Sequence, residues 1–299
     1  MRRETALLVF GAGGQLCRAL LALHRPGMLR VQGLGRAEAD ITDMGAVAAA
    51  IGRARPDVVV NAAAFTNVDQ AETDTSRCMA ANRDGAAVLA ETAAALGVAL
   101  LQVSTDYVFD GVLDRPYTED DLVAPLNQYG LAKAEAELLV RALAPRHVIL
   151  RTAWLFGPHG RNFLRTVQRL AAAGGPLRMV ADQHGNPTPA TALAAAIAGI
   201  AHRIAAGRGV WGTFHCAGAP ATTWHGFAQA IVAAGWPEGE RPAVLPIATA
   251  EYPLPAARPR HAVLDCTRLL AAYGIAQPDW RDFLPGPCSY ASSESISAA

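Results

Sequence analysis

The sequence feature that most constrains the fold is a glycine-rich turn between an apolar run and a helical pattern near the start of the chain. Residues 5–10 form a short apolar run typical of a buried strand, and residues 11–14 (GAGG) follow directly. A helical pattern then extends over about residues 15–24. Glycines in such a turn let backbone N–H groups approach a pyrophosphate, whose charge a helix N-terminus favours. Residues 11–16 are therefore predicted to bind a dinucleotide.

Strand and helix patterns alternate through the first half of the chain. We expect Thr42 to cap a helix that runs to about Ala54, and a long alanine-rich helix from about Ser76 to Leu96, ended by Gly97. The predicted strands are residues 5–10, 29–34, 58–61, 98–103 and 148–150. This alternation predicts an α/β fold with a Rossmann-type, doubly wound parallel sheet. Right-handed crossovers place the carboxyl ends of the strands along one edge, where such sheets bind ligands.

The second half of the chain is less regular and predicts a smaller C-terminal substrate-binding domain. Helical patterns cover residues 163–173, 191–206 and 224–234, whereas six prolines from Pro237 to Pro259 predict extended or loop structure. We expect a dinucleotide-binding domain over residues 1–153 and a substrate lobe over residues 154–288, with some later segments returning to the sheet. The serine-rich residues 289–299 are predicted to be a disordered tail.

Lys133 is the only lysine among 26 basic residues, the others being arginine. It follows Tyr129 by four positions, so both side chains share one face of a predicted helix. An ammonium beside a phenol lowers the pKa of the phenol, which can then exchange a proton with a sugar hydroxyl or carbonyl. A guanidinium does not imitate this compact point charge. The pair therefore predicts acid–base catalysis by Tyr129, with Lys133 tuning it and bonding the nicotinamide ribose.

Polar residues that follow two other predicted strands complete the expected site. Thr105 closes the fourth strand, where its hydroxyl can orient and polarise a reacting oxygen. After the second strand, Arg36 stands where an acidic residue would favour NADH, so it is a candidate partner for the 2′-phosphate of NADPH. Asp40 follows the second strand by a few residues, so its carboxylate could reach the adenine amine. The neighbouring Ile41 belongs to the same segment.

Composition excludes several other classes of protein. The chain is 52% hydrophobic and 17% charged, and 26 basic residues balance 26 acidic ones, which excludes a disordered chain and argues against a nucleic-acid partner. No apolar run is long enough to span a membrane, and no signal peptide is recognised, so a cytoplasmic location is expected. The five cysteines form no CxxC pair, and neither histidines nor carboxylates cluster with ligand spacing, so no metal site is predicted.

Taken together, these motifs resemble the extended short-chain dehydrogenase/reductases and, within them, the dTDP-4-dehydrorhamnose reductase family. The resemblance runs from Leu7 to about Leu284 and rests on the blocks FGAGGQL, PDVVVNAAAFTNVDQAE, STDYVFDG, PLNQYGLAK, LRTAWLFGPHGRNF, ADQHGNPTPA, EYPLPAARPRHAVLD and PDWRDFL. It implies reduction of the C4 ketone of dTDP-4-dehydro-L-rhamnose by NADPH or NADH, giving dTDP-L-rhamnose. It also implies a monomer or a homodimer. Some members bridge a dimer through magnesium held by glutamates, and Ala19 stands where one glutamate is expected, which argues against such a dimer.

The resemblance also assigns roles to individual residues. Tyr129 would donate the proton, Lys133 would be its partner, and Thr105 would orient the carbonyl. Residues implied at the sugar are Thr105, Asp106 and Trp154. Residues implied at the cofactor are Gly11, Gly14, Gln15, Leu16, Arg36, Asp40, Ile41, Ala63, Ala64, Thr66, Tyr129 and Lys133.

Three alternatives remain open at the level of sequence. The first is a reductase of another dTDP-4-keto-6-deoxy sugar in antibiotic biosynthesis, because pocket shape decides the sugar. The second is a nucleotide-sugar epimerase or dehydratase, although Tyr107 stands after Asp106 where dehydratases carry a glutamate. The third is a non-catalytic NADP-binding subunit, against which the intact Thr105, Tyr129 and Lys133 weigh.

Overall fold

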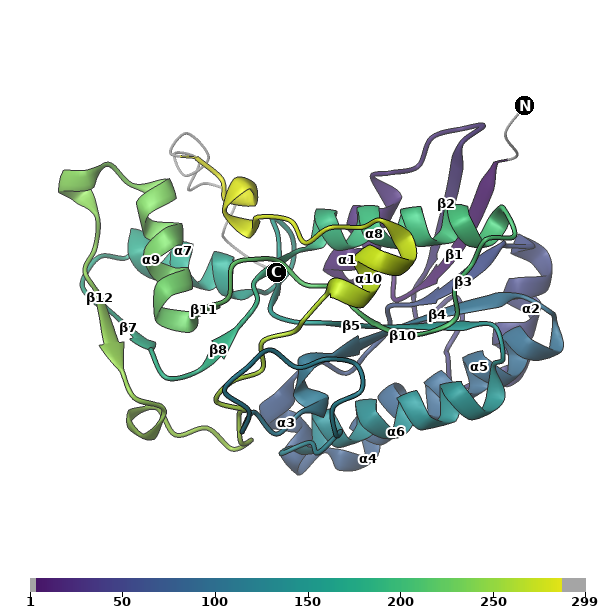
Figure 1. The fold of residues 1–299 in the computed structure, drawn as a ribbon, viewed down its shortest axis with the longest axis horizontal. Coiled ribbons are helices and arrows are strands. Elements are labelled where there is room, and N and C mark those ends of the chain that lie inside the picture. Colours follow the sequence, from purple (N-terminus) through teal and green to yellow (C-terminus); the bar gives the residue numbers. More distant parts are fainter. Residues whose placement is uncertain (1–3, 287–299) are drawn as a thin grey trace.

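The computed structural model describes residues 4–286, which form a six-stranded parallel sheet with helices on both faces and a second, smaller lobe at one end (Figure 1). The strand order is β10-β5-β4-β3-β1-β2. The strands are β1 (Thr5–Phe10), β2 (Leu29–Leu34), β3 (Val58–Asn61), β4 (Ala99–Thr105), β5 (His147–Thr152) and β10 (Gly212–His215). The sheet is therefore Rossmann-type, as predicted, and its sixth strand comes from the second half of the chain.

Apolar side chains on both faces of the strands explain why the sheet is covered on each side. On one face the core is closed by α1 (Gln15–Leu21), α8 (Ala190–Ala205) and α10 (Thr267–Tyr273). On the other face it is closed by α2 (Met44–Ala54), α5 (Gly85–Ala95) and α6 (Gln128–Leu143). In Figure 1 the first group lies above the sheet and the second below it. No helix among residues 4–286 is both long and apolar enough to cross a membrane.

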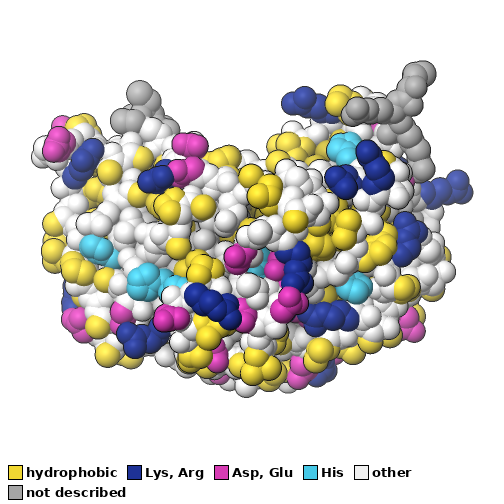
Figure 2. Space-filling model, in the orientation of Figure 1, with side chains coloured by type: hydrophobic (Ala, Val, Ile, Leu, Met, Phe, Trp, Pro, Cys, Tyr) yellow, Lys and Arg dark blue, Asp and Glu magenta, His cyan; other side chains and the backbone are white. Residues whose placement is uncertain are grey.

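The smaller lobe is built from segments after residue 154. It contains α7 (Phe163–Ala172) and α9 (Trp224–Gly235), packed on the parallel pair β7 (Leu177–Val180) and β12 (Val244–Ile247). Two short pairs connect it to the rest, namely β6 (Leu155–Phe156) with β9 (Thr188–Pro189), and β8 (His184–Gly185) with β11 (Thr222–Thr223). Aromatic rings fill its core, including Phe156, Phe227 and Trp280. Figure 2 shows the upper outline of the molecule dipping between this lobe and the sheet-bearing part.

The structure corrects three local expectations. The predicted helix over residues 76–96 is divided into α4 (Thr75–Met79), a π-helical turn at Ala80–Asp84 and α5, preceded by α3 (Val68–Thr73). Asp43, not Thr42, caps α2 by accepting a hydrogen bond from the N–H of Ala46, because the Thr42 hydroxyl donates to Asp40 instead. Helix α1 ends at Leu21, short of the expected His24. The tail predicted at residues 289–299 lies outside the described residues.

A buried ionic network joins α6 to the sheet. Arg151 on β5 donates from Nε and Nη2 to the carboxylate of Glu137 on α6, at 2.9 and 2.7 Å, and both side chains are 1% exposed. Ser104 on β4 donates to the same carboxylate at 2.7 Å. Burial alone would raise the pKa of Glu137, but the hydrogen bonds and charge of Arg151 hold it below its usual value. The pair therefore stays ionised and satisfied inside the protein.

His215 on β10 borders this network as a neutral acceptor. Its Nε2 lies 3.3 Å from Nη1 of Arg151, while its Nδ1 lies 3.1 Å from the carbonyls of Tyr117 and Asp265. Burial and the nearby Arg151 charge lower the pKa of His215 to about 3. Because an unfolded histidine titrates near pH ~6.5, only the unfolded state binds this proton between the two values. His215 therefore makes the folded state less stable as the pH falls from about 6.5 to 3.

We predict that His215→Gln weakens the pH dependence of stability in that window. Glutamine can keep a donor toward the carbonyls and an acceptor toward Arg151, but it does not titrate. The unfolding free energy of the wild type should fall more steeply than that of the variant, by roughly 1 kcal/mol per pH unit. Urea denaturation between pH 3 and 7 measures both slopes, and identical slopes would contradict a neutral, buried His215.

Candidate active site

A cavity of about 360 Å³ lies at the carboxyl ends of β1, β3, β4 and β5. This is the edge where the strand order reverses, between β1 and β3, and where doubly wound sheets bind their ligands. The cavity extends from the glycine turn at Gly13 and Gly14 to the polar groups of Thr105 and Tyr129. A Cβ built on Gly13 would meet no atom within 4 Å, so the turn borders open space. This cradle fits the phosphates of a dinucleotide.

Most of the residues expected at the site line this one cavity. They come from separate loops and from α6, and the fold brings them together. They are Gly14, Gln15, Leu16, Ala63, Ala64, Thr66, Thr105, Asp106, Tyr129, Lys133 and Trp154.

Four expected cofactor residues lie outside the lining of the cavity. Gly11 has φ +106°, and a Cβ there would come within 2.7 Å of the Ala62 backbone, so this glycine permits close packing of two loops. Arg36 and Asp40 form an exposed ion pair at 2.9 Å. The Asp40 carboxylate also accepts from the N–H and hydroxyl of Thr42, and these contacts lower its pKa. Ile41 is buried among core side chains.

Tyr129, Thr105 and Asp106 line the same end of the cavity. The Thr105 hydroxyl donates to Oδ1 of Asp106 at 3.0 Å. Burial raises the pKa of Tyr129, the Asp106 charge raises it further, and the Thr105 hydroxyl opposes them. Burial also raises the pKa of Asp106 to about 7, and its Oδ2 is buried without a hydrogen-bond partner. The phenol therefore holds its proton at neutral pH, in contrast to the lowered pKa expected from sequence.

Lys133 lies one turn along α6 and is 3% exposed. Its Nζ donates to the carbonyl of Val103 at 2.5 Å, so it is anchored to β4. Burial lowers the pKa of Lys133 to about 8, while the charge of Glu137 works in the opposite direction. The single lysine of the chain is therefore a buried, titratable group rather than a surface charge.

A second cavity of about 560 Å³ lies beside the first, in the smaller lobe. Two aromatic pairs separate them. Tyr107 lies edge-on to Tyr129 with ring centroids 6.0 Å apart, and Trp224 stacks on Trp154 at 3.5 Å. Tyr107 and Trp224 line the larger cavity, whereas Tyr129 and Trp154 line the smaller one. The Trp154 backbone has φ +44°, a strained value for a bulky residue and one that concentrates at functional sites.

Sequence reasoning missed three residues that shape the site. Asn82, in the π-helical turn, bonds both the N–H and the carbonyl of Phe65 and so fixes the loop that carries Ala64 and Thr66. Asn162 donates to the side chain of Gln15 at 2.8 Å.

The third is Arg258, which pairs with both carboxylate oxygens of Asp69 and lines the larger cavity together with Tyr107. An asparagine inside an alanine-rich helical run was the one available signal for Asn82, because asparagine favours caps and turns.

In residues 4–286, no group of three or more His, Cys, Asp or Glu side chains is arranged to hold a metal ion.

Known proteins match this chain over nearly its whole length. Residues 5–288 match the family model described as RmlD substrate binding domain. A dTDP-4-dehydrorhamnose reductase from Aggregatibacter actinomycetemcomitans is 43% identical over 291 residues, which cover 95% of this chain and 99% of that protein.

Two solved structures share the fold. A dTDP-4-dehydrorhamnose reductase ortholog from Clostridium acetobutylicum has a TM-score of 0.87 at 35% identity, and one from Bacillus anthracis in complex with NADP has a TM-score of 0.86 at 31% identity. Each comparison covers 94% of this chain and 97% of the other.

The Rossmann-type sheet, the glycine turn and the cavity define a dinucleotide-binding fold, and the relatives place it among the NAD(P)H-dependent oxidoreductases. Within that class, the chain belongs to the dTDP-4-dehydrorhamnose reductase family.

We predict that Lys133→Arg destabilises the protein by about 1–3 kcal/mol, since a longer, planar side chain must replace a buried ammonium that is anchored to the Val103 carbonyl. Cofactor affinity should fall as well, because Lys133 lines the cavity. Denaturant unfolding and titration with NADPH measure the two effects. The control Arg53→Lys, on the exposed face of α2, should stay within about 0.5 kcal/mol. Wild-type stability and affinity in Lys133→Arg would place Lys133 outside the site.

Proposed function

We propose that the protein reduces the C4 ketone of dTDP-4-dehydro-L-rhamnose to the hydroxyl of dTDP-L-rhamnose. The observation that carries the proposal is the convergence of Thr105, Tyr129 and Lys133 on a cavity that begins at the glycine turn. Family membership supports the choice of substrate. When bound, NADPH or NADH supplies the hydride.

Tyr129 is the proposed proton donor. Its raised pKa keeps the phenol protonated at neutral pH, which suits reduction, because the carbonyl oxygen must gain a proton as it becomes a hydroxyl. Thr105 lines the same cavity as Tyr129 and orients the carbonyl oxygen. Lys133 tunes the phenol and contacts the nicotinamide ribose. Gly14, Gln15 and Leu16 are the proposed residues that bind the pyrophosphate. Ala63, Ala64 and Thr66 line the part of the cavity that would hold the rest of the cofactor.

The larger cavity is the proposed place for the thymidine diphosphate. Arg178 and Arg258 line it and supply positive charge for the two phosphates, and the Trp224 and Tyr107 rings offer apolar faces to the base and sugars. The reacting sugar would then pass between the aromatic pairs, against Asp106 and Trp154, to reach Tyr129. Residues 154–288, apart from the segments that join the sheet, form the proposed substrate lobe, and residues 1–153 form the cofactor domain.

The deciding experiment incubates the full chain with dTDP-4-dehydrorhamnose and NADPH, and identifies the product. Stoichiometric oxidation of NADPH with formation of dTDP-L-rhamnose supports the proposal. An epimerase or dehydratase would show no net consumption of cofactor, and a binding subunit would turn over nothing. A product with a different configuration at C4, or activity confined to another dTDP-4-keto-6-deoxy sugar, would identify a related reductase instead.

We predict that Tyr129→Phe lowers kcat by roughly 100-fold or more, because general acid catalysis contributes about 10²–10⁴-fold. Removing one hydroxyl leaves the ring beside Tyr107 in place, so NADPH affinity should change little. The matched control is Tyr273→Phe, whose hydroxyl bonds Val210 on a different part of the molecule. Activity of Tyr129→Phe within threefold of the wild type would refute the assignment.

We predict that Arg36→Ala lowers kcat/KM for NADPH about fivefold more than for NADH. Arg36 is exposed and pairs with Asp40. An exposed ion pair between Arg36 and the 2′-phosphate would contribute ~1 kcal/mol to binding. Initial rates with each cofactor, at low and high salt, give the ratio. If the ratio is the same in wild type and variant, Arg36 serves only the surface pair with Asp40.

A further inference from the structure

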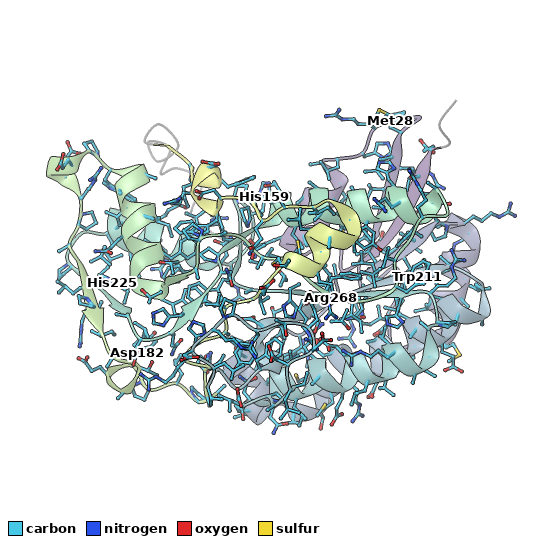
Figure 3. The ribbon with its side chains drawn as sticks, in the orientation of Figure 1. Met28, His159, Asp182, Trp211, His225 and Arg268 are labelled. Atoms are coloured by element: carbon cyan, nitrogen blue, oxygen red, sulfur yellow. The ribbon has the colours of Figure 1, made fainter. Side chains whose placement is uncertain are left out.

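The loop between β6 and α7 lies against the glycine turn. Its residues Gly160 and Arg161 line the same cavity as Gly13, Gly14 and Gln15, although they are distant in sequence. A Cβ on Gly160 would approach Cγ of Gln15 to 3.1 Å, and Gly160 has φ +71°. Figure 3 shows His159, from the same loop, at the upper edge between the two parts of the molecule. The loop therefore forms one wall of the cavity where the dinucleotide phosphates are expected.

Asn162 holds this loop in place. Its Nδ2 donates to Oε1 of Gln15 at 2.8 Å and to the carbonyls of Gly157 and His159 at 2.8 and 3.1 Å. Its Oδ1 accepts from the N–H of Arg165 and so caps α7. One side chain thus fixes the shape of the loop, the start of α7 and the contact with the first residue of α1.

Arg161 is the only charged side chain at this end of the cavity. The other charged lining residues, Asp106 and Lys133, lie at the Thr105 and Tyr129 end. Among the described residues, no carboxylate forms an ion pair with Arg161, and no hydrogen bond of its side chain is found. A pyrophosphate carries two negative charges, and α1 is only seven residues long with no side-chain cap at Gly14. A cation from another element would therefore add binding energy that the turn does not provide.

We propose that Arg161 binds the pyrophosphate of the dinucleotide, and that Asn162 is the positioning residue that holds Arg161 beside the glycine turn. The inference rests on the proposed function only in requiring a dinucleotide in this cavity. Since both NADPH and NADH contain the pyrophosphate, Arg161 contributes equally to the two cofactors. This separates it from Arg36, whose proposed partner is the 2′-phosphate.

The test measures dissociation constants of NADPH, NADH and ADP for the full chain by calorimetry. Arg161→Ala should weaken NADPH and NADH by the same factor, about tenfold, as expected for loss of a charge-assisted hydrogen bond. ADP should weaken too, and the affinity of the variant should depend less on ionic strength. The matched control, Arg165→Ala, removes an exposed arginine that does not line the cavity.

The positioning role of Asn162 is tested with Asn162→Ser, because serine keeps the helix cap but loses the three amide contacts. The variant should retain its melting temperature and weaken both cofactors. In the Arg161→Ala background the same change should add little, because Asn162 acts through Arg161. Fully additive effects would overturn this role.

The possible failures are distinguishable. If Arg161→Ala binds both cofactors as the wild type does, or weakens NADPH alone, the inference is wrong while the proposed function stands. If the wild type binds neither dinucleotide, the proposed function fails, and this inference fails with it.

Discussion

The ion pair between Glu137 and Arg151 lies beneath the proposed reacting groups and joins the elements that carry them. Glu137 is on α6, one turn after Lys133, and Arg151 is on β5. Ser104, which donates to the same carboxylate, directly precedes Thr105 on β4. Removing Glu137 would leave the buried Arg151 charge uncompensated, whereas Glu137 also pairs with Arg141 on its own helix. The pair with Arg151 is the one that holds α6 against the sheet at one position. The separation of Tyr129 from Thr105 depends on that position.

The first turn of α6 is set by contact as well as by charge. A Cβ on Gly130 would lie 2.2 Å from the carbonyl oxygen of Tyr107, so only glycine lets α6 approach the end of β4 this closely. The approach brings the rings of Tyr107 and Tyr129 together in the wall between the two cavities. With the Trp154 and Trp224 stack, this wall divides the proposed cofactor side from the proposed nucleotide side and leaves the reacting group at the boundary.

Much of the fold could be predicted because its signals are local. The apolar runs of β1 and β3 and the glycines after β1 follow from residue type alone, and strand–helix alternation then requires a parallel sheet. The site residues Thr105, Tyr129 and Lys133 were found because each occupies a strand end or a shared helix face. Local competition explains the wrong cap of α2. Thr42 and Asp43 are both good caps, and the hydrogen bond of Thr42 to Asp40 decided between them.

The sequence by itself determined the strand–helix alternation of the Rossmann-type sheet, the glycine turn and the placement of Tyr129 and Lys133 one turn apart on a single helix, since each depends on neighbours within a few positions. Only the tertiary structure decided the electrostatics of the site. Burial, which no local pattern specifies, raises the pKa of Tyr129 and lowers that of Lys133. Contacts such as that of Asn162 with Gln15, which are 147 positions apart, likewise exist only once the chain has packed, because they depend on how distant loops meet at one edge of the sheet.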